Sequence, residues 1–372
     1  MYWTILAISA ISGILYHFYC SIFLRGLKTH KQKFNPHKPF VSVIIAARNE
    51  EMNIARCLTS VLNQSYPTEL FEVIVAEDSS TDSTATIIDT FTEKFHNLQR
   101  MAVKDRDKAK SPKKNALSQA IAVSKGEILM FTDADCVVGQ HWIKAMIAQY
   151  EDDTAVLAGY SSIHLQDWSK AKLVHKFEFL DFYSLVAANA GAICGGKYFA
   201  CCGQNFSYRR SAYDHVGGFS RIAHIISGDD INMLQLFRQA KLKIDYSFSR
   251  HTSVSTKPIT GWWQLINQRI RWSSNIKYQL QLNPELFLYF FTIFGYNIGI
   301  ILLFFRYWSI ALAVLVFKGF MDYRILGYAT EIFLVDKKRF RYFIPWLLLQ
   351  NIYTLIVGPA GLFNLFRWRG RH

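Results

Sequence analysis

Residues 40–47 are FVSVIIAA, a short run rich in β-branched side chains that predicts a strand buried on both faces. Similar runs follow at 71–76 (FEVIVA) and 127–132 (EILMFT). Helical patterns occupy residues 51–64, 82–95 and 113–124. Strands separated by helices of this length predict parallel β-α-β units, and therefore an α/β fold with an open sheet. Such sheets bind ligands beyond the carboxyl ends of their strands.

Polar residues follow each of these three predicted strands. They are Arg48-Asn49-Glu50 after the first, Glu77-Asp78 after the second, and Asp133-Ala134-Asp135 after the third. Asp133 and Asp135 point to the same side of an extended segment. Two carboxylates so placed suit Mg²⁺ or Mn²⁺ bridging to a diphosphate. The alternative is that these Asp residues only cap helices or form turns, which we favour for Asp82.

A second acidic pair, Asp229-Asp230, stands directly before a helical pattern at 231–240. A helix N-cap explains one of these carboxylates but not both. We therefore expect Asp230 to face the site as a general base that deprotonates an attacking hydroxyl.

The sequence contains neither a P-loop motif nor a dinucleotide-binding glycine motif. Phosphate charge must then be balanced by a metal, by Lys113 or Lys114 at the start of a helix, or by an arginine from elsewhere. Residues 268–272 (QRIRW) predict such an arginine, because Gln268, Arg271 and Trp272 share one helix face. The alternative is an amphipathic helix that lies on a membrane, with Trp262 and Trp263 at the interface.

The first 24 residues contain no Lys, Arg, Asp or Glu and are long enough to cross a membrane. Basic residues follow at once, between Arg25 and Lys33, and no small-residue cleavage site is present. We expect a retained anchor with the middle of the chain on the cytoplasmic side. A buried helix of a soluble protein is the alternative.

The C-terminal part has further apolar runs, at 286–305, 308–320 and 342–366. The first two suggest a membrane hairpin. Basic clusters at 337–341 and 367–371 flank the last run, and both favour the cytoplasm. We therefore expect this run to be re-entrant or interfacial, which gives two to three C-terminal transmembrane or interfacial helices.

Composition supports a membrane-bound, folded chain. Of 372 residues, 51% are hydrophobic and 19% are charged, which excludes a disordered protein. The net charge of +14 lies largely beside the apolar runs, so we expect no nucleic-acid partner. Six cysteines without a C-x-x-C pair argue against a disulfide scaffold or a zinc module.

The ordered set of motifs resembles family 2 glycosyltransferases with the GT-A fold, a Rossmann-like and mostly parallel sheet. The motifs are 46–50 (AARNE), 77–82 (EDSSTD), 133–135 (DAD), 203–205 (GQN) with Arg209-Arg210, 217–219 (GGF), 228–230 (GDD) and 268–272. The flanking segments resemble the membrane-bound branch that includes cellulose, chitin and hyaluronan synthases and ceramide glucosyltransferase.

The resemblance implies a role for each site residue. Donor-binding residues would be Ala47, Arg48, Asn49, Glu50, Glu77, Asp78, Lys113, Asp133 and Arg271. Asp133 and Asp135 would hold the metal, Asp230 would be the catalytic base, and Asp229, Gln268 and Trp272 would close over the acceptor. Two motifs depart from the family pattern: Glu77-Asp78-Ser79-Ser80 replaces Asp-Asp-Gly-Ser, and Gly228-Asp229-Asp230 replaces Thr-Glu-Asp.

The resemblance further implies an inverting transfer from a UDP- or GDP-sugar to a lipid or lipid-linked acceptor. A processive polysaccharide synthase and a catalytically silent sugar-nucleotide-binding subunit are the alternatives. The chain would be an integral protein of the plasma or inner membrane with a cytoplasmic catalytic domain. We expect an anchor at 1–25, the GT-A domain at 38–260, an interfacial helix at 261–282, a membrane region at 285–366 and a basic tail at 367–372.

Overall fold

The computed structural model describes residues 2–31 and 33–367. The chain forms two compact units. The sheet unit comprises residues 31–164 and 200–257, and the helical unit comprises residues 1–30, 165–199 and 258–372. Arg369 and Arg371 of the predicted basic tail lie outside the described residues.

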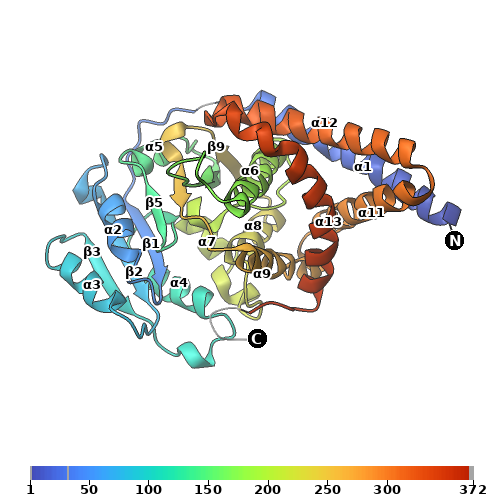
Figure 1. The fold of residues 1–372 in the computed structure, drawn as a ribbon. Coiled ribbons are helices and arrows are strands. Elements are labelled where there is room, and N and C mark those ends of the chain that lie inside the picture. Colours follow the sequence, from blue (N-terminus) through green and yellow to red (C-terminus); the bar gives the residue numbers. More distant parts are fainter. Residues whose placement is uncertain (1, 32, 368–372) are drawn as a thin grey trace. The chain divides into compact units, whose positions relative to one another are not determined.

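The core of the sheet unit is a seven-stranded sheet with the order β3-β2-β1-β4-β8-β6-β9 among the described residues (Figure 1). Its strands are β1 (Val41–Ala47), β2 (Phe71–Glu77), β3 (Leu98–Ala102), β4 (Ile128–Phe131), β6 (Thr154–Gly159), β8 (Phe206–Arg209) and β9 (Lys243–Ser247). Among the described strands of this sheet, only β8 runs antiparallel to its neighbours. The predicted α/β class with a mostly parallel sheet is therefore confirmed.

The three predicted strands occupy the parallel part of this sheet. Strand β1 lies between β2 and β4, and its Val43, Ile44 and Ile45 are completely buried, as the apolar run predicts. Ala47 pairs with Glu77 at the carboxyl end, and Ile44 pairs with Phe131 of β4. The residues that follow the three strands are thus brought to the same edge of the sheet.

A second, three-stranded sheet was not predicted. It consists of β5 (Cys136–Val138), β10 (Val254–Thr256) and β7 (Ser161–Ile163), in that order. Strands of three residues are too short to show a periodic pattern in the sequence. Pairing of β5 with β10 connects the segment after Asp135 to the end of the sheet unit.

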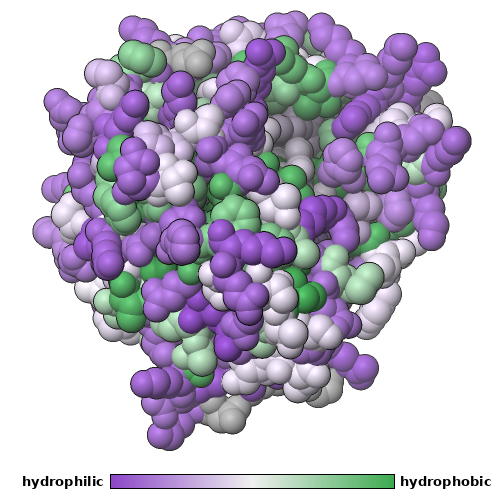
Figure 2. All heavy atoms as spheres, turned by 90° about the vertical axis from the view of Figure 1, so that its left-hand side faces the viewer, coloured by the Kyte–Doolittle hydropathy of each residue, from purple (hydrophilic) through white to green (hydrophobic). Residues whose placement is uncertain are grey.

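Six α-helices are described in the sheet unit (Figure 1). They are α2 (Ile54–Leu62), α3 (Thr84–Thr92), α4 (Pro112–Val123), α5 (Trp142–Ile147), α7 (Arg210–His215) and α8 (Asp229–Gln239). The three helices predicted at the strand crossovers exist. Helices α2 and α3 are shorter than the predicted 51–64 and 82–95, because those ranges included residues of the flanking turns, whereas α4 has the predicted length and begins one residue earlier. Hydrophilic side chains predominate on the face drawn in Figure 2, on the side where α2 and α3 lie.

The helical unit contains the apolar ends of the chain. Its helices are α1 (Tyr2–Thr29), α6 (Leu173–Cys194), α9 (Trp262–Ser273), α10 (Ile276–Leu282), α11 (Pro284–Arg306), α12 (Trp308–Phe333) and α13 (Phe343–Leu362). Small residues allow close packing: a Cβ atom on Gly26 of α1 would lie 2.0 Å from the carbonyl oxygen of Gly191 on α6. On α11, a Cβ atom on Gly299 would lie 2.2 Å from the Cβ atom of Ser9.

Three segments among the described residues are long and apolar enough to cross a membrane: Leu6–Thr29, Pro284–Arg306 and Lys337–Leu362. Membrane-type helices at both ends of the chain are thereby confirmed. Helix α12 continues well beyond the predicted run at 308–320 and contains Lys318, Asp322 and Arg324. Its length fits a span, but its charged residues keep it from being a fourth candidate.

Candidate active site

The loops after β1 and β2 are connected to each other at the edge of the sheet. The backbone N–H of Asp78 donates to the carbonyl oxygen of Ala47 over 2.9 Å. Asn49 adopts a left-handed backbone conformation, with a φ of 53°, and its side-chain oxygen accepts a hydrogen bond of 2.8 Å from the backbone N–H of Thr81. The predicted donor-binding segments that include Arg48 and Glu50 therefore lie beside the segment of Asp78.

The two acidic residues at the end of β2 have different partners. A Glu77 carboxylate oxygen accepts a hydrogen bond of 2.6 Å from the backbone N–H of Ser80, which holds the turn. The Asp78 carboxylate pairs with Arg106 Nε at 3.1 Å. Asp82 accepts from the backbone N–H of Thr84 at 3.0 Å, near the start of α3, which is the turn role that we favoured for it.

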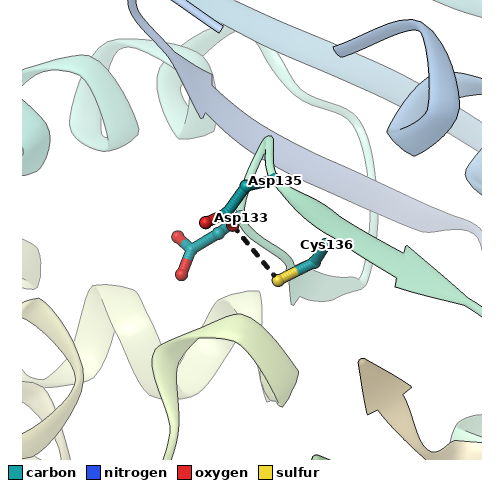
Figure 3. A group of neighbouring side chains, drawn as sticks. All are labelled: Asp133, Asp135 and Cys136. Atoms are coloured by element: carbon teal, nitrogen blue, oxygen red, sulfur yellow. Dashed lines mark hydrogen bonds between the residues drawn. The ribbon is translucent and has the colours of Figure 1, made fainter. Parts of the chain in front are cut away.

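Asp133 and Asp135 lie in the turn between β4 and β5 with their carboxyl groups close together (Figure 3). Ligand atoms of these two residues and Cys136 all lie within 4.8 Å of one another. Burial and the neighbouring Asp133 raise the pKa of Asp135. Because a divalent cation would relieve this repulsion and carboxylate oxygens are hard ligands, the two residues fit Mg²⁺ or Mn²⁺.

The thiol of Cys136 contacts an Asp135 carboxylate oxygen at 3.4 Å, the dashed contact in Figure 3. Cys136 is buried, and its burial and the neighbouring carboxylate raise the pKa of the thiol. A protonated thiol is a poor metal ligand and a poor nucleophile. The thiol is therefore best described as part of the packing beneath the two carboxylates.

Lys113 connects the two acidic pairs of the sheet unit. Its Nζ lies 2.9 Å from Asp133 Oδ1 and 3.0 Å from Asp229 Oδ2. Burial opposes the charged form of Lys113, but Asp133 and Asp229 outweigh it and raise its pKa. Asp229, from the second acidic pair, and Asp133, one of the two predicted metal ligands, therefore both contact the ammonium group of Lys113.

Asp229 and Asp230 form the first turn of α8, rather than preceding the helix as the sequence pattern predicts. The helix begins earlier because Gly228 takes the capping position, with a φ of 69° that favours glycine. Asp230 Oδ1 accepts from the backbone N–H of Ile231 at 2.7 Å, and Oδ2 accepts from the N–H of Gly203 at 2.8 Å. Both carboxylates thus lie where a helix N-terminus favours negative charge.

The two carboxyl groups of this pair differ in proton affinity. Burial alone would raise the pKa of Asp229, but Lys113 and Lys114 outweigh it and lower the pKa. For Asp230, burial and the adjacent Asp229 raise the pKa. A carboxylate with a raised pKa is the stronger base of the two, which is the property that proton abstraction requires.

The predicted helix with the QRIRW motif exists as α9 in the helical unit. Gln268, Arg271 and Trp272 are half-buried, whereas Arg269 is buried. The Arg269 guanidinium donates to the side-chain oxygen of Gln268 and lies 4.1 Å from the ring centre of Trp272. Sequence reasoning missed Arg269, which contacts two of the three residues expected to act together.

A buried acidic group on α6 holds Arg269. Arg269 Nε donates to Asp181 Oδ2 at 2.6 Å, and the Tyr353 hydroxyl of α13 donates to Asp181 Oδ1 at 2.7 Å. One turn earlier on α6, burial raises the pKa of Glu178 to about 7. The sequence signal was available, because Glu178 and Asp181 interrupt an otherwise apolar and aromatic helix.

The aromatic residues of α6 are core residues. Phe177, Phe179, Phe182 and Tyr183 are all buried in the helical unit. Phe177 packs against Trp262 of α9, with ring centres 5.4 Å apart, and Phe182 packs against Trp272 at 6.2 Å. The aromatic run of α6 therefore supports α9.

Comparisons with known proteins concern the sequence family and the fold. The family model described as Glycosyl transferase family 2 matches residues 42–217. The probable glycosyltransferase YdaM of Bacillus subtilis is 25% identical over 286 residues, which are 71% of this chain and 64% of that protein. A beta-monoglucosyldiacylglycerol synthase of Nostoc sp. is 25% identical over 275 residues, 72% of this chain and 55% of that one. The chain thus spans less than two thirds of both relatives.

Among solved structures, a mannosyltransferase of Pyrobaculum calidifontis, PcManGT, in complex with GDP-Man and Mn²⁺ has a TM-score of 0.63 to this chain. The two are 15% identical, and the match covers 97% of this chain and 99% of that one. At this identity the likeness shows a common fold, which is GT-A. The segment that matches the model of glycosyltransferase family 2, residues 42–217, contains β1, β2 and β4 with the carboxylates at their ends.

Proposed function

We propose that the chain is a membrane-bound glycosyltransferase that moves a sugar from a UDP- or GDP-sugar to a lipid or lipid-linked acceptor at the cytoplasmic face of the membrane. The observation that carries this proposal is the pair of contacts from Lys113 to Asp133 and Asp229. These contacts bring a carboxylate pair at strand ends next to a carboxylate pair at a helix start. In the proposed reaction, the first pair would serve the diphosphate side and the second pair the acceptor side.

On the donor side, Asp78 and Glu77 would contact the nucleotide base and ribose, together with the segment from Ala47 to Glu50. Asp133 and Asp135 would hold a divalent cation. When bound, Mg²⁺ or Mn²⁺ supplies positive charge to the diphosphate leaving group. Lys113 would add its ammonium charge to the same phosphates.

On the acceptor side, Asp230 would accept the proton of the attacking hydroxyl. The hydroxyl oxygen forms a bond to the anomeric carbon while the bond from that carbon to the diphosphate oxygen breaks. One in-line displacement of this kind inverts an α-linked donor to a β-glycoside. Gln268, Arg271 and Trp272 would close over the diphosphate and the acceptor.

Two observations support a lipid acceptor. Within the described part of the chain, three helices are long and apolar enough to cross a membrane. One relative is named as a synthase of a glucosylated diacylglycerol. The basic residues after α1 and between α12 and α13 favour the cytoplasmic side by the positive-inside rule, and they support a catalytic domain that faces the nucleotide-sugar pool.

A donor screen tests the proposal. Purified protein in vesicles that contain diacylglycerol would receive labelled UDP-glucose, UDP-N-acetylglucosamine or GDP-mannose, and mass analysis would identify the product. We expect one defined glycolipid from one of the donors. A ladder of polymer would favour the processive synthase, and the absence of product with all three donors and with membrane extract would contradict sugar transfer.

A further inference from the structure

A buried lysine at the start of α4 contacts the loop that leads into α8. Lys114 is 2% exposed. Its Nζ donates to the carbonyl oxygens of Ile225 at 2.6 Å and Ser227 at 2.9 Å. The hydroxyl of Ser111 donates to the carbonyl oxygen of Ile226 at 2.8 Å. Three successive carbonyl groups of the loop therefore accept hydrogen bonds from side chains at the start of α4.

The loop determines where the acidic residues of α8 lie. Gly228 follows the loop, and Asp229 and Asp230 begin the helix. The Asp230 carboxylate is held there by hydrogen bonds from two backbone N–H groups, that of Ile231 at 2.7 Å and that of Gly203 at 2.8 Å. A small shift of the loop would therefore displace Asp230 and lengthen its hydrogen bond from the Gly203 N–H.

We propose that Lys114 is a positioning residue for Asp230: its ammonium group holds the carbonyls of Ile225 and Ser227 and thereby sets the place of the Asp230 carboxylate. This inference rests on the proposed function, in which Asp230 is the base. Lys114 differs in this from its neighbour Lys113, whose contacts are with carboxylates. Lys113 would thus act on Asp229 by direct contact, whereas Lys114 would act on Asp230 through the loop that precedes it.

The charge of Lys114 is sensitive to pH. Burial lowers its pKa, Asp229 and Asp230 oppose this shift and Lys113 adds to it, and the net result is a pKa of about 8. These three groups are the charged neighbours that act on Lys114. Above pH 8 the ammonium loses its proton, and its charge-assisted bonds to the two carbonyls weaken. The hydrogen bonds from Lys114 to the loop are therefore strongest near neutral pH and weaken as the pH rises through about 8.

Hydrogen–deuterium exchange of the full-length protein directly tests whether Lys114 stabilises the loop, and it does not require activity. In the wild type we expect the peptide over 222–232 to be protected at pH 7 and to lose protection at pH 9, after correction for intrinsic exchange. In Lys114→Met the peptide should exchange about tenfold faster at pH 7, the size expected for losing charged hydrogen bonds. Lys125→Met, which changes an exposed lysine just after α4, should match the wild type.

Sugar transfer then tests the consequence for Asp230. In Lys114→Met we expect kcat to fall by about 10- to 100-fold, as for a misplaced catalytic group, with the KM for the nucleotide sugar within about twofold. The wild-type kcat should fall as the pH rises through about 8, and this alkaline decrease in kcat should be absent in Lys114→Met. A purely structural lysine would not move the pH profile.

The outcomes separate the two proposals. Unchanged loop exchange in Lys114→Met, or altered exchange with wild-type kcat and pH profile, would overturn the role of Lys114 and leave glycosyl transfer intact. If the wild type transfers no sugar from any donor, the proposed function fails, whereas faster exchange in Lys114→Met would still support the hold of Lys114 on the loop.

Discussion

Lys113 Nζ lies 3.0 Å from Asp229 Oδ2, although the two residues begin different helices, α4 and α8. The same nitrogen lies 2.9 Å from Asp133. One cation therefore stands between the group expected to bind the metal and the group next to the expected base. This relationship predicts how Lys113 affects the binding of the metal and the binding of the nucleotide.

Lys113→Met should have opposite effects on the two ligands. Without the ammonium group, Asp133 is freer to bind a cation, so the affinity for Mn²⁺ alone should rise. The affinity for a nucleoside diphosphate in the presence of Mn²⁺ should fall by about tenfold, because one charged hydrogen bond to phosphate is lost. Titration calorimetry with MnCl₂, and then with UDP or GDP, measures both. A loss of affinity for Mn²⁺ alone would contradict this role of Lys113.

Asp133→Asn and Asp135→Asn should each weaken Mn²⁺ binding, because each removes one charged oxygen ligand. Electron paramagnetic resonance counts the free and bound ion without any need for turnover. Cys136→Ser is the matched control at the neighbouring position, and we expect it to bind Mn²⁺ like the wild type. If only Cys136→Ser lost Mn²⁺ binding, the thiol and not the two carboxylates would be the metal ligand.

The acid limb of the pH profile should report Asp230. A base must be deprotonated to act, and the pKa of Asp230 is raised by burial and by Asp229. The rate should therefore fall with decreasing pH at a value above about 4, where an ordinary aspartate titrates. Asp229→Asn removes the neighbouring negative charge, so its acid limb should move to lower pH. If the acid limb of Asp229→Asn stays at the wild-type pH, Asp230 next to Asp229 is not the group that titrates.

The buried pair of Arg269 and Asp181 should be important for stability. Both side chains are less than 5% exposed. Asp181→Asn leaves the guanidinium without its counter-charge, which we expect to cost about 3–5 kcal/mol of unfolding free energy. Thermal unfolding in detergent measures the loss. The double variant Asp181→Leu with Arg269→Met should be less destabilised than Asp181→Asn, because neither charge remains buried alone; equal losses would contradict this explanation.

The strand ends of the sheet unit could be predicted from the sequence, and most of the interactions around them could not. The β-branched runs predicted β1, β2 and β4, and parallel connections then brought the carboxylates of Asp78 and Asp133 to one edge. The contact of Lys113 with Asp229 joins residues 116 positions apart. No local pattern encodes such a pair, since it depends on how α4 and α8 pack.

Helix faces were predictable in α9, but the burial of Arg269 was not. Helical spacing groups residues by face without indicating which face meets the core. The acidic partner that makes a buried arginine tolerable, Asp181, belongs to α6 and is 88 positions away. The sequence leaves Lys114 as one of several candidates to balance phosphate charge, whereas in the structure its Nζ donates to the carbonyl groups of a loop.

Sugar transfer by wild type and Asp230→Asn, compared side by side, is the most direct test of the proposed mechanism. Both proteins would be assayed in diacylglycerol vesicles with the donor that the screen identifies, and the product would be analysed for mass and anomeric configuration. We predict a β-linked glycolipid from the wild type, and a rate at least about 100-fold lower for Asp230→Asn with the same nucleotide affinity. Wild-type turnover by Asp230→Asn would contradict the role of Asp230 as the base.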